Sequence, residues 1–212
     1  MSTIGIIGVT GYVGSHVAEE ALARGHEVIG VTPNRPRETP AGVELLVGSF
    51  ADPALREDLF ARADSVLVAV RAGRQPLLLD SLEDLLKAAK EHGTRLGFMG
   101  GAASLLMSPG GIRVLDRPGF PEAMRPEAEA HVEVLKALHN DTSGADWFYI
   151  SPAIGFGPST PGERTGHYRT DTDVAVTDSE GKSFISGADL AVAFVDEIEV
   201  PRHHRQRFSV GY

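Results

Sequence analysis

The stretch Gly8-Val9-Thr10-Gly11-Tyr12-Val13-Gly14 places three glycines at intervals of three residues near the start of the chain. Before it, residues Thr3 to Val9 have the apolar character of a short β-strand. After it, apolar residues recur at helical spacing, and Gly25 is suited to end a helix; they are Val13, Val17, Ala21 and Leu22. The stretch therefore predicts a turn that leads from the first strand into the first helix.

Each glycine of this turn has a separate physical task. Gly8 permits the tight turn, Gly11 lets the backbone approach a pyrophosphate, and Gly14 lets the helix pack closely on the strand. The free amides at the helix N-terminus, with about half a positive charge behind them, then face a negative ligand. A strand and a helix on either side make a dinucleotide-binding turn the preferred interpretation over a plain glycine-rich turn.

Strands and helices alternate along the rest of the chain. Strands are expected at Glu27 to Thr32, Val43 to Val47, Ser65 to Val70, Arg95 to Met99, Trp147 to Ser151, His167 to Thr170, Val174 to Thr177 and Arg207 to Val210. Helices are expected after Asp52-Pro53 and at Leu77 to His92, Pro126 to Leu138 and Ala188 to Glu197. This alternation predicts an α/β fold, a Rossmann-type doubly wound parallel sheet covered on both faces.

We expect one domain over residues 1–212. Residues 1–150 read as its core. Residues 151–212, with parts of 100–125, read as a small C-terminal cap and a last strand. In such sheets ligands bind beside the carboxyl ends of the strands, so the cap is expected there.

The end of the second strand indicates the type of dinucleotide. NAD-binding proteins place an acid there, about 20 residues after the glycines. Here the sequence runs Val31-Thr32-Pro33-Asn34-Arg35-Pro36-Arg37, without an acid. A guanidinium group matches a 2′-phosphate in charge and geometry, so Arg35 and Arg37 favour NADP(H) over NAD(H). The alternative is that both are solvated loop arginines.

Composition excludes several classes of protein. The chain has 212 residues, a net charge of −9 and no cysteine, so disulfide frameworks, cysteine-based metal sites and thiol catalysis are excluded. The acidic balance argues against nucleic-acid and membrane partners, and no run is apolar enough to span a bilayer. We expect a cytoplasmic protein with a small-molecule partner and no metal site; self-association stays open.

Several further stretches carry a resemblance to a known family. They are Gly100-Gly101-Ala102-Ala103-Ser104-Leu105, Phe120-Pro121-Glu122-Ala123, Pro126-Glu127-Ala128, Ser151-Pro152-Ala153, Pro161-Gly162-Glu163-Arg164-Thr165-Gly166-x-Tyr168-Arg169 and Gln206-Arg207-Phe208-x-Val210-Gly211-Tyr212. Together with the glycine turn, the chain resembles the atypical short-chain dehydrogenases/reductases. Within these it is similar to the NADH-flavin reductase group, which is related to NmrA-like proteins and to flavin/biliverdin reductase B.

The resemblance implies a set of cofactor-binding positions. Gly8, Thr10, Gly11, Tyr12, Val13 and Gly14 would form the pyrophosphate turn, Asn34 and Arg35 would lie near the adenosine ribose, Ser49 and Phe50 near the adenine, Ala69, Val70 and Arg71 beside the nicotinamide ribose, and Ser104 and Pro152 at the nicotinamide and substrate pocket. Many relatives carry Asp where Ser49 stands.

One departure from the short-chain dehydrogenases bears on the reaction. Their catalytic Tyr-x-x-x-Lys pair is missing, and Met124 and Ala128 occupy its place. Reducing a ketone needs a proton donor, whereas a flavin accepts hydride directly and can take its proton from water. We therefore expect an NAD(P)H-dependent reductase of a flavin or a similar conjugated acceptor such as a quinone.

Other residues are candidates for the pocket. Ser104 is expected either to donate to an acceptor oxygen or to cap a turn, and His131 either to protonate substrate or to be an ordinary surface histidine. Phe156 and Tyr168 could stack on a flavin or pack in the core. Met107 and Met124 are expected to fill gaps in the core.

Two other functions stay open. One is a non-catalytic, NmrA-like redox sensor that binds the dinucleotide and signals to a protein partner. The other is a reductase or epimerase of short-chain dehydrogenase type that acts on a dedicated metabolite, with His131 as an unorthodox acid.

Overall fold

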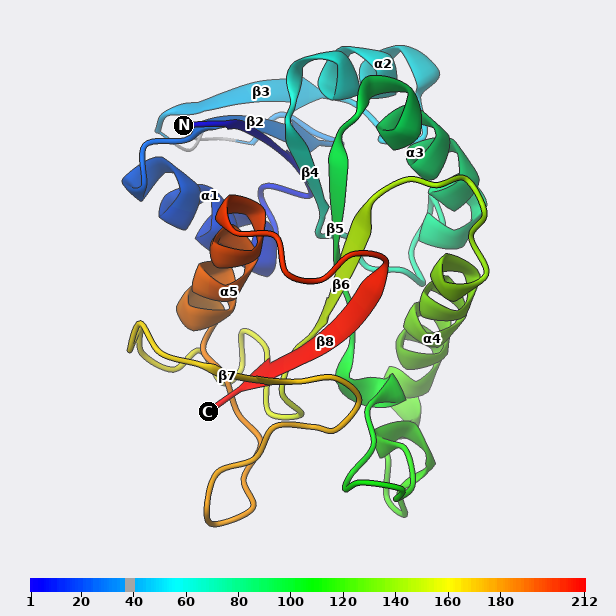
Figure 1. Ribbon diagram of the computed structural model, residues 1–212, viewed down its shortest axis with the longest axis vertical. Coiled ribbons are helices and arrows are strands. Elements are labelled where there is room, and N and C mark those ends of the chain that lie inside the picture. The colour runs from blue at the N-terminus through cyan, green and yellow to red at the C-terminus, as the bar shows by residue number, and fades with distance from the viewer. Residues whose placement is uncertain (37–40) are drawn as a thin grey trace.

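The computed structural model describes residues 1–36 and 41–212 and shows a single eight-stranded sheet (Figure 1). The strand order is β3-β2-β1-β4-β5-β6-β8-β7, and all neighbours are parallel except β7 and β8. The strands are β1 (Thr3–Ile7), β2 (Glu27–Thr32), β3 (Val43–Val47), β4 (Ser65–Val68), β5 (Arg95–Met99), β6 (Trp147–Ser151), β7 (Arg169–Asp171) and β8 (Gln206–Gly211). The order 3-2-1-4-5-6 confirms the predicted Rossmann-type, doubly wound fold.

Five α-helices connect the described strands, and local signals in the sequence set their ends. They are α1 (Tyr12–Ala23), α2 (Pro53–Arg62), α3 (Leu78–His92), α4 (Arg125–His139) and α5 (Gly187–Glu199). Asp52 caps α2 by accepting a hydrogen bond from the Ala54 amide. Gly93 ends α3 in the left-handed conformation. Ser186 caps α5 by accepting from the Asp189 amide.

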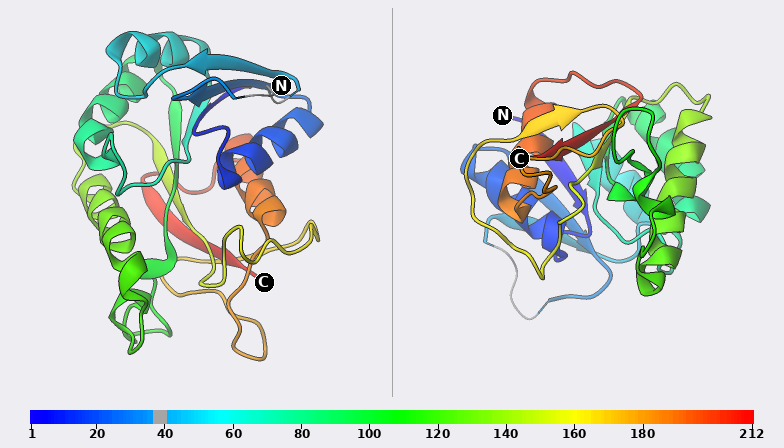
Figure 2. Two further views of the ribbon diagram at one scale, coloured as in Figure 1. Left: turned by 180° about the vertical axis from the view of Figure 1, so that it is seen from behind. Right: turned by 90° about the horizontal axis from the view of Figure 1, so that it is seen from below.

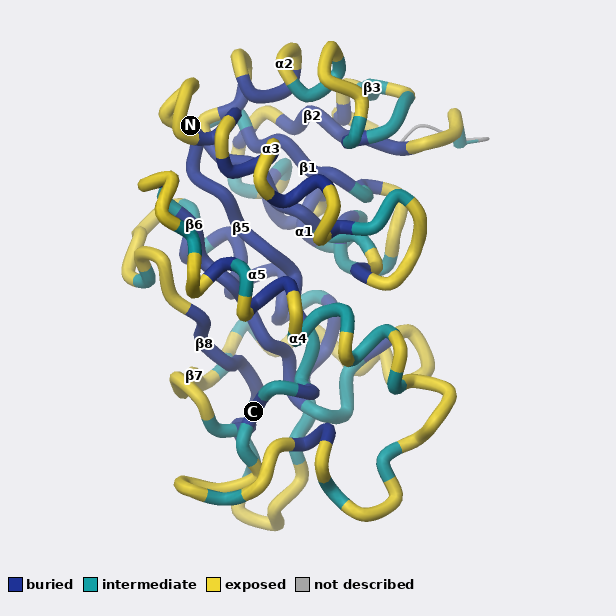
Figure 3. Tube along the Cα trace, turned by 90° about the vertical axis from the view of Figure 1, so that its right-hand side faces the viewer, coloured by how far each residue is buried: buried dark blue, intermediate teal, exposed yellow. Residues whose placement is uncertain are grey.

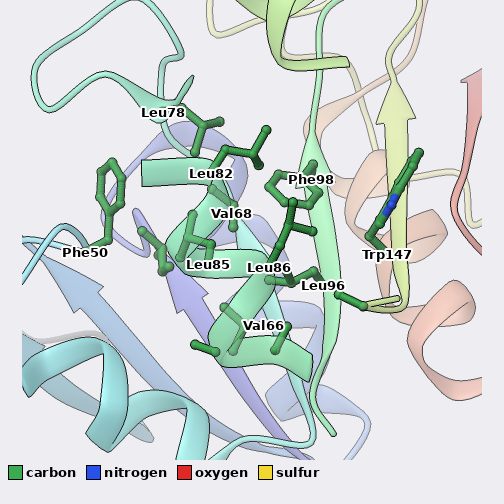
Figure 4. Packing of buried hydrophobic residues seen from close by; sticks show 14 of the residues in the cluster. Phe50, Val66, Val68, Leu78, Leu82, Leu85, Leu86, Leu96, Phe98 and Trp147 are labelled. Atoms are coloured by element: carbon green, nitrogen blue, oxygen red, sulfur yellow. The ribbon is translucent and has the colours of Figure 1, made fainter. Parts of the chain in front are cut away.

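The helices lie on both faces of the sheet (Figure 2). Residues alternate between the faces along each strand, so Val66, Val68 and Phe98 pack against α2, α3 and α4 (Figure 4). Leu67 of β4 and Phe148 of β6 lie on the other face of the sheet and pack against α1 and α5. The central strands are buried along most of their length, and the exposed residues lie in the loops and on the outer faces of the helices (Figure 3). This burial on both faces explains why the strands read as apolar runs.

Two differences from the expected elements have physical reasons. The predicted strand Val174 to Thr177 is wrong: within the described chain only Val174 makes a ladder contact, an isolated bridge with Leu106. Ala175 instead packs with the loop that follows β5, in a small cluster with Leu105 and Val114. β1 and β4 also end two residues earlier than expected, at Ile7 and Val68, because the chain leaves the sheet at the glycine turn and at the loop beside it.

Two long segments, residues 100–124 and 152–186, gather at the carboxyl ends of the strands (Figure 1). The first contains the 3₁₀ helices η1 (Ala102–Ser104), η2 (Val114–Asp116) and η3 (Glu122–Met124). Residues 100–124 and 152–186 form the cap. α5 and β8 do not belong to it, because β8 continues the parallel sheet and α5 packs beside α1. The C-terminal third therefore supplies both the cover of the site and part of the core. No helix in the described parts of the chain is long and apolar enough to cross a bilayer.

A buried ion pair joins the amino end of β5 to the end of α5. Arg95 donates to the Glu197 carboxylate at 2.6 Å, and the Glu197 side chain is only 4% exposed. Burial acts to raise the pKa of Glu197, but hydrogen bonds from Arg95, His203 and Arg202 outweigh it and hold the pKa below its usual value. The folded state therefore favours the ionised carboxylate.

Replacing Arg95 should test this pair. Arg95→Met leaves a buried carboxylate without its guanidinium, so we expect a loss of about 3–5 kcal/mol in the free energy of unfolding, measured with urea at neutral pH. Because the pKa of Glu197 is lowered on folding, its contribution is present above its ordinary pKa and is lost as the pH falls through the lowered value. The effect of Arg95→Met should therefore shrink in acid. Arg113→Met, which removes an exposed pair with Asp116, is the control and should change stability little; equal effects of the two variants would contradict the assignment.

Candidate functional site

The strand order reverses direction between β1 and β4, and this marks the expected ligand crevice. β1 pairs with β2 on one side and with β4 on the other. The chain leaves β1 toward α1 on one face of the sheet and leaves β4 toward α3 on the other (Figure 1). In open parallel sheets such a switch point leaves a crevice at the carboxyl ends of the strands.

The glycine turn between β1 and α1 has the geometry that its sequence predicts. Gly8 has a φ of +91°, and a Cβ added there would lie 2.6 Å from the Ala69 carbonyl oxygen. A Cβ at Gly14 would lie 2.2 Å from the Gly8 carbonyl oxygen, so only glycine lets the helix start so close to the turn. Gly8 also accepts a hydrogen bond from the Gly11 amide at 2.9 Å.

The N-terminus of α1 is open toward the crevice. Gly11 is its N-cap, no described side chain caps it, and its first turn contains no acid. A Cβ at Gly11 would touch the Gly8 carbonyl oxygen at 3.1 Å and otherwise only the Ala69 oxygen at 3.9 Å. The space in front of Gly11 is thus free for a phosphate to approach the amides of Tyr12, Val13 and Gly14, and these residues fit a pyrophosphate.

The end of β2 lies next to this turn. Thr10 is exposed, and its hydroxyl is 3.2 Å from that of Thr32, the last residue of β2. Asn34 and Arg35 follow and are exposed, and neither side chain has a hydrogen-bond or ion-pair partner among the described residues. Arg37, the second arginine predicted to favour a 2′-phosphate, lies outside the described residues.

The predicted adenine contacts differ from each other in exposure. Ser49 is half-buried, and its hydroxyl accepts a hydrogen bond from the Ala51 amide at 3.2 Å. The ring of Phe50 is only 7% exposed and packs at the rim of the core cluster (Figure 4). Any contact of Phe50 with an adenine therefore falls to its main chain.

The loop after β4 forms the other side of the crevice. The Ala69 amide donates to the Ile7 carbonyl at 2.9 Å, and Val70 and Arg71 follow it. Arg71 donates to Glu127 on α4 at 3.3 Å, and Glu127 also lies 3.2 Å from Nε2 of His131. Burial acts to raise the pKa of Glu127, but His131, Arg71 and the Ala72 amide outweigh it and hold the pKa below its usual value. Glu127 thus links α4 to the end of β4 as an ionised carboxylate.

Buried polar atoms without a partner lie at the same ends of the strands. Within the described residues these include the Tyr12 hydroxyl, Nδ1 of His131 and the hydroxyl of Ser151, the last residue of β6. Pro152 follows, also buried. Unpaired buried polar groups are uncommon in folded proteins, and their presence here agrees with a site that completes its hydrogen bonds with a ligand.

The loop after β5 carries Ser104, one of the two predicted catalytic residues. Ser104 ends η1, and its hydroxyl accepts a hydrogen bond from Arg207 at 3.2 Å. On the other side of this loop, the ring of His131 packs beside Gly101. The structure therefore brings Ser104 and His131 to the two sides of the segment that follows β5.

Four other candidates have different places. The Tyr168 hydroxyl donates to Asp196 on α5 at 2.8 Å, which assigns Tyr168 to the packing of the cap. The ring of Phe156 lies 5.6 Å from that of Tyr12, beside the start of α1. The prediction that Met107 and Met124 fill core gaps is wrong, because they are 41% and 60% exposed on the cap.

Sequence reasoning missed the partners of the candidate residues. Arg207 lies 103 positions from Ser104, and Glu127 lies 56 positions from Arg71. The sequence did contain Arg207 and Glu127 in the stretches that resemble a known family, which was the one signal that could have drawn attention to them.

A groove of about 1000 Å³ lies elsewhere, between α5, β7 and β8. Its described lining includes the candidate Tyr168 but none of the residues predicted to bind the cofactor, and neither Ser104 nor His131. The position of the ligand crevice is therefore assigned from the strand order and the glycine turn, and not from the volume of a groove. No cluster of three metal-ligating side chains occurs in the described parts of the chain.

A parallel sheet with a glycine turn and open helix amides at its switch point defines the class of dinucleotide-binding α/β proteins. The chain belongs to the NAD(P)H-binding family, whose model matches residues 8–201. This membership confirms the predicted type of cofactor, a nicotinamide dinucleotide.

Relatives extend over the whole chain. It is similar to YwnB of Bacillus subtilis (strain 168), an uncharacterized protein, with 36% identity over 213 residues that cover 98% of this chain and 97% of YwnB. It is also similar to SP1627 of Streptococcus pneumoniae TIGR4, named as a candidate NADH-flavin reductase, with 30% identity, a TM-score of 0.84 and coverage of 100% of this chain and 99% of that chain. A candidate epimerase from Bacteroides thetaiotaomicron has 32% identity, a TM-score of 0.87 and coverage of 100% and 97%. These matches confirm the resemblance to atypical short-chain dehydrogenases and support an NAD(P)H oxidoreductase.

Two glycine substitutions should separate an effect on NADPH binding from an effect on the stability of the fold. Gly11→Ala places a methyl group where the phosphate approaches, so we expect a folded protein whose affinity for NADPH is at least about tenfold weaker, a loss of about 1.4 kcal/mol, in a fluorescence titration. Gly14→Ala forces the helix away from Gly8 and should destabilise the fold by about 1–3 kcal/mol. If Gly11→Ala binds NADPH as tightly as the unaltered protein, the pyrophosphate does not lie at this turn.

Proposed function

We propose that the protein is an NAD(P)H-dependent reductase that passes hydride to a flavin or a similar conjugated acceptor such as a quinone. The observation that carries the proposal is an open dinucleotide turn in a chain that lacks the Tyr-x-x-x-Lys pair. Met124 and Ala128 stand where the Tyr-x-x-x-Lys pair is expected, and Met124 is exposed at the end of η3. The nearby Tyr149 is buried, and its hydroxyl donates to the His131 carbonyl.

The residues around the crevice divide the work of binding. The amides of α1 and the Thr10 hydroxyl hold the pyrophosphate, Asn34 and Arg35 contact the adenosine ribose, and Ser104 and Pro152 border the nicotinamide. The reduced nicotinamide supplies a hydride, and the acceptor gains this hydride and one proton. The protein contributes alignment, which can lower the barrier by about 7–11 kcal/mol.

A turnover assay tests this proposal. We expect purified protein to oxidise NADPH in the presence of FMN, FAD, riboflavin or menadione, followed by the absorbance of the reduced nicotinamide. Gly11→Ala is the matched control and should lose turnover at the same NADPH concentration, because only its dinucleotide turn is changed. Absence of turnover above background with all four acceptors would remove the reductase proposal.

The preference for NADP(H) is part of the proposal. The end of β2 carries no acid, and Arg35 is exposed and has no ion-pair partner among the described residues, so it can pair with a 2′-phosphate. Arg35→Ala should raise the Kd for NADPH about tenfold, as expected for one lost charge-assisted hydrogen bond, and should leave the Kd for NADH nearly unchanged. Arg62→Ala, at an exposed arginine on α2, controls for net charge. Equal loss of affinity for both nucleotides would contradict a 2′-phosphate contact.

A second activity is favoured by the contact between Glu127 and His131. A carboxylate beside an imidazole orients the ring for proton transfer. A reductase or epimerase that acts on a dedicated metabolite could use His131 as its acid. In that case His131→Ala would bind NADPH normally and lose turnover of the metabolite, whereas flavin reduction, which takes its proton from water, would persist.

The proposal extends to the kind of partner and to the location of the protein in the cell. The net charge of −9 disfavours nucleic acid and anionic membranes as partners. We propose a small-molecule acceptor as the partner and the cytoplasm as the location. An NmrA-like sensor would show NADPH binding without turnover in the assay above.

A further inference from the structure

Arg207 is a buried guanidinium next to the proposed reaction site. It lies on β8, paired in register with Tyr149 of β6, and is 7% exposed. Its Nη1 donates to the Ser104 hydroxyl at 3.2 Å, and its Nη2 donates to Asp173. Its Nε has no hydrogen-bond partner among the described residues. Both Arg207 and Ser104 belong to stretches whose role the fold alone does not explain.

The surroundings of Arg207 compensate its charge only in part. Asp173, the carboxylate that pairs with it, has a side chain that is 66% exposed. Water screens an exposed carboxylate, so this pair returns little of the free energy needed to bury the guanidinium. A well-packed apolar side chain could fill the same place without that penalty. The burial of the Arg207 guanidinium at this cost in free energy indicates that Arg207 acts on its other partner, Ser104.

The hydrogen bond from Arg207 determines which way the Ser104 proton points. A hydroxyl has one proton to donate and two lone pairs that accept. Because Oγ accepts from Arg207, the proton is directed away from the guanidinium. The structure shows no acceptor for it among the described residues. Ser104 follows β5 at the carboxyl edge of the sheet, and β5 pairs with β6, the strand that leads to Pro152. Its proton is thus free for a ligand in the crevice.

We propose that Arg207 is a positioning residue that orients and polarises the Ser104 hydroxyl toward a carbonyl oxygen of the acceptor. This inference rests on the proposed reductase function and assigns to it a class of acceptor, conjugated rings with a carbonyl oxygen. As hydride adds to such a ring, negative charge grows on that oxygen, and a hydrogen bond from Ser104, strengthened by the guanidinium, stabilises it. The proton that completes the reduction comes from water, and Ser104 keeps its own. The pair thereby takes over the electrostatic part of the missing Tyr and Lys.

Steady-state kinetics with NADPH and menadione test the proposal. We expect Ser104→Ala to lower kcat about 100-fold, the loss seen when one donor to a developing oxyanion is removed. Arg207→Met should lower kcat about tenfold, and Arg207→Lys, which restores a positive charge, should recover part of that loss. Arg207→Met in the Ser104→Ala background should cause no further loss, because Arg207 acts through Ser104. The KM for NADPH should stay within about twofold throughout.

Asp173→Asn is the matched control. It removes the carboxylate that pairs with Arg207 and leaves the contact with Ser104 in place. If Arg207 only ties the cap to the sheet, Asp173→Asn should lower kcat and the melting temperature as much as Arg207→Met does. If Arg207 serves Ser104, Asp173→Asn should keep at least the unaltered kcat. Should Arg207→Met fail to fold, Arg207→Gln, which keeps a donor without the charge, replaces it in the same comparison.

The outcomes separate this inference from the function on which it rests. Turnover by the unaltered protein, with an unchanged kcat in Arg207→Met or with losses that add to those of Ser104→Ala, overturns the role of Arg207 alone. An unaltered protein that neither binds NADPH nor reduces menadione overturns the proposed function and this role with it.

Discussion

The close contact between Gly14 and the Gly8 carbonyl is the constraint on which the site depends. There is no room for a Cβ at Gly14, and the Gly11 amide donates to the same carbonyl. Together these two features bring the first turn of α1 up to the end of β1. The helix amides therefore open at the switch point between β1 and β4, where a phosphate gains both their hydrogen bonds and the helix dipole. A start of α1 even one residue later would turn these amides away from the neighbouring loop at Ala69.

Buried polar groups help to hold the cap, beside the apolar cluster of Leu105, Val114 and Ala175. Asp189, near the start of α5, is fully buried and accepts hydrogen bonds from the Thr165 and Gly166 amides and from the Tyr212 hydroxyl. Burial acts to raise the pKa of Asp189, but these bonds outweigh it and hold the pKa below its usual value. Arg164 extends the same segment to Glu20 on α1. Thr165, Gly166 and Tyr212, which carry much of the resemblance to the family, thus serve to fix the cap to the two helices beside the site.

Signals confined to a few neighbouring residues were sufficient to predict most of the fold. The apolar runs predicted the bounds of β2, β3, β5 and β6, and Asp52-Pro53 and Gly93 predicted the start of α2 and the end of α3. The false strand at Val174 to Thr177 shows the limit of this reasoning, because Ala175 packs against the loop after β5 and only Val174 forms a bridge, so the segment does not pair along a strand. The same reasoning could not predict the partners of Ser104 and His131, because contacts such as that between Arg207 and Ser104 form only when distant strands become neighbours in the sheet.

The distribution of charge reconciles an acidic protein with an anionic ligand. The net charge is −9, which by itself would repel a dinucleotide. At physiological ionic strength, however, exposed charges are screened beyond about 8 Å, so the groups that line the crevice decide. There, α1 begins without an acid, Arg35 follows β2, and Arg71, which follows β4, pairs with Glu127. The buried acids Asp189 and Glu197 are each compensated by their own donors. The open amides at the start of α1, with no acid in the first turn, therefore favour an anion at the glycine turn although the protein as a whole is acidic.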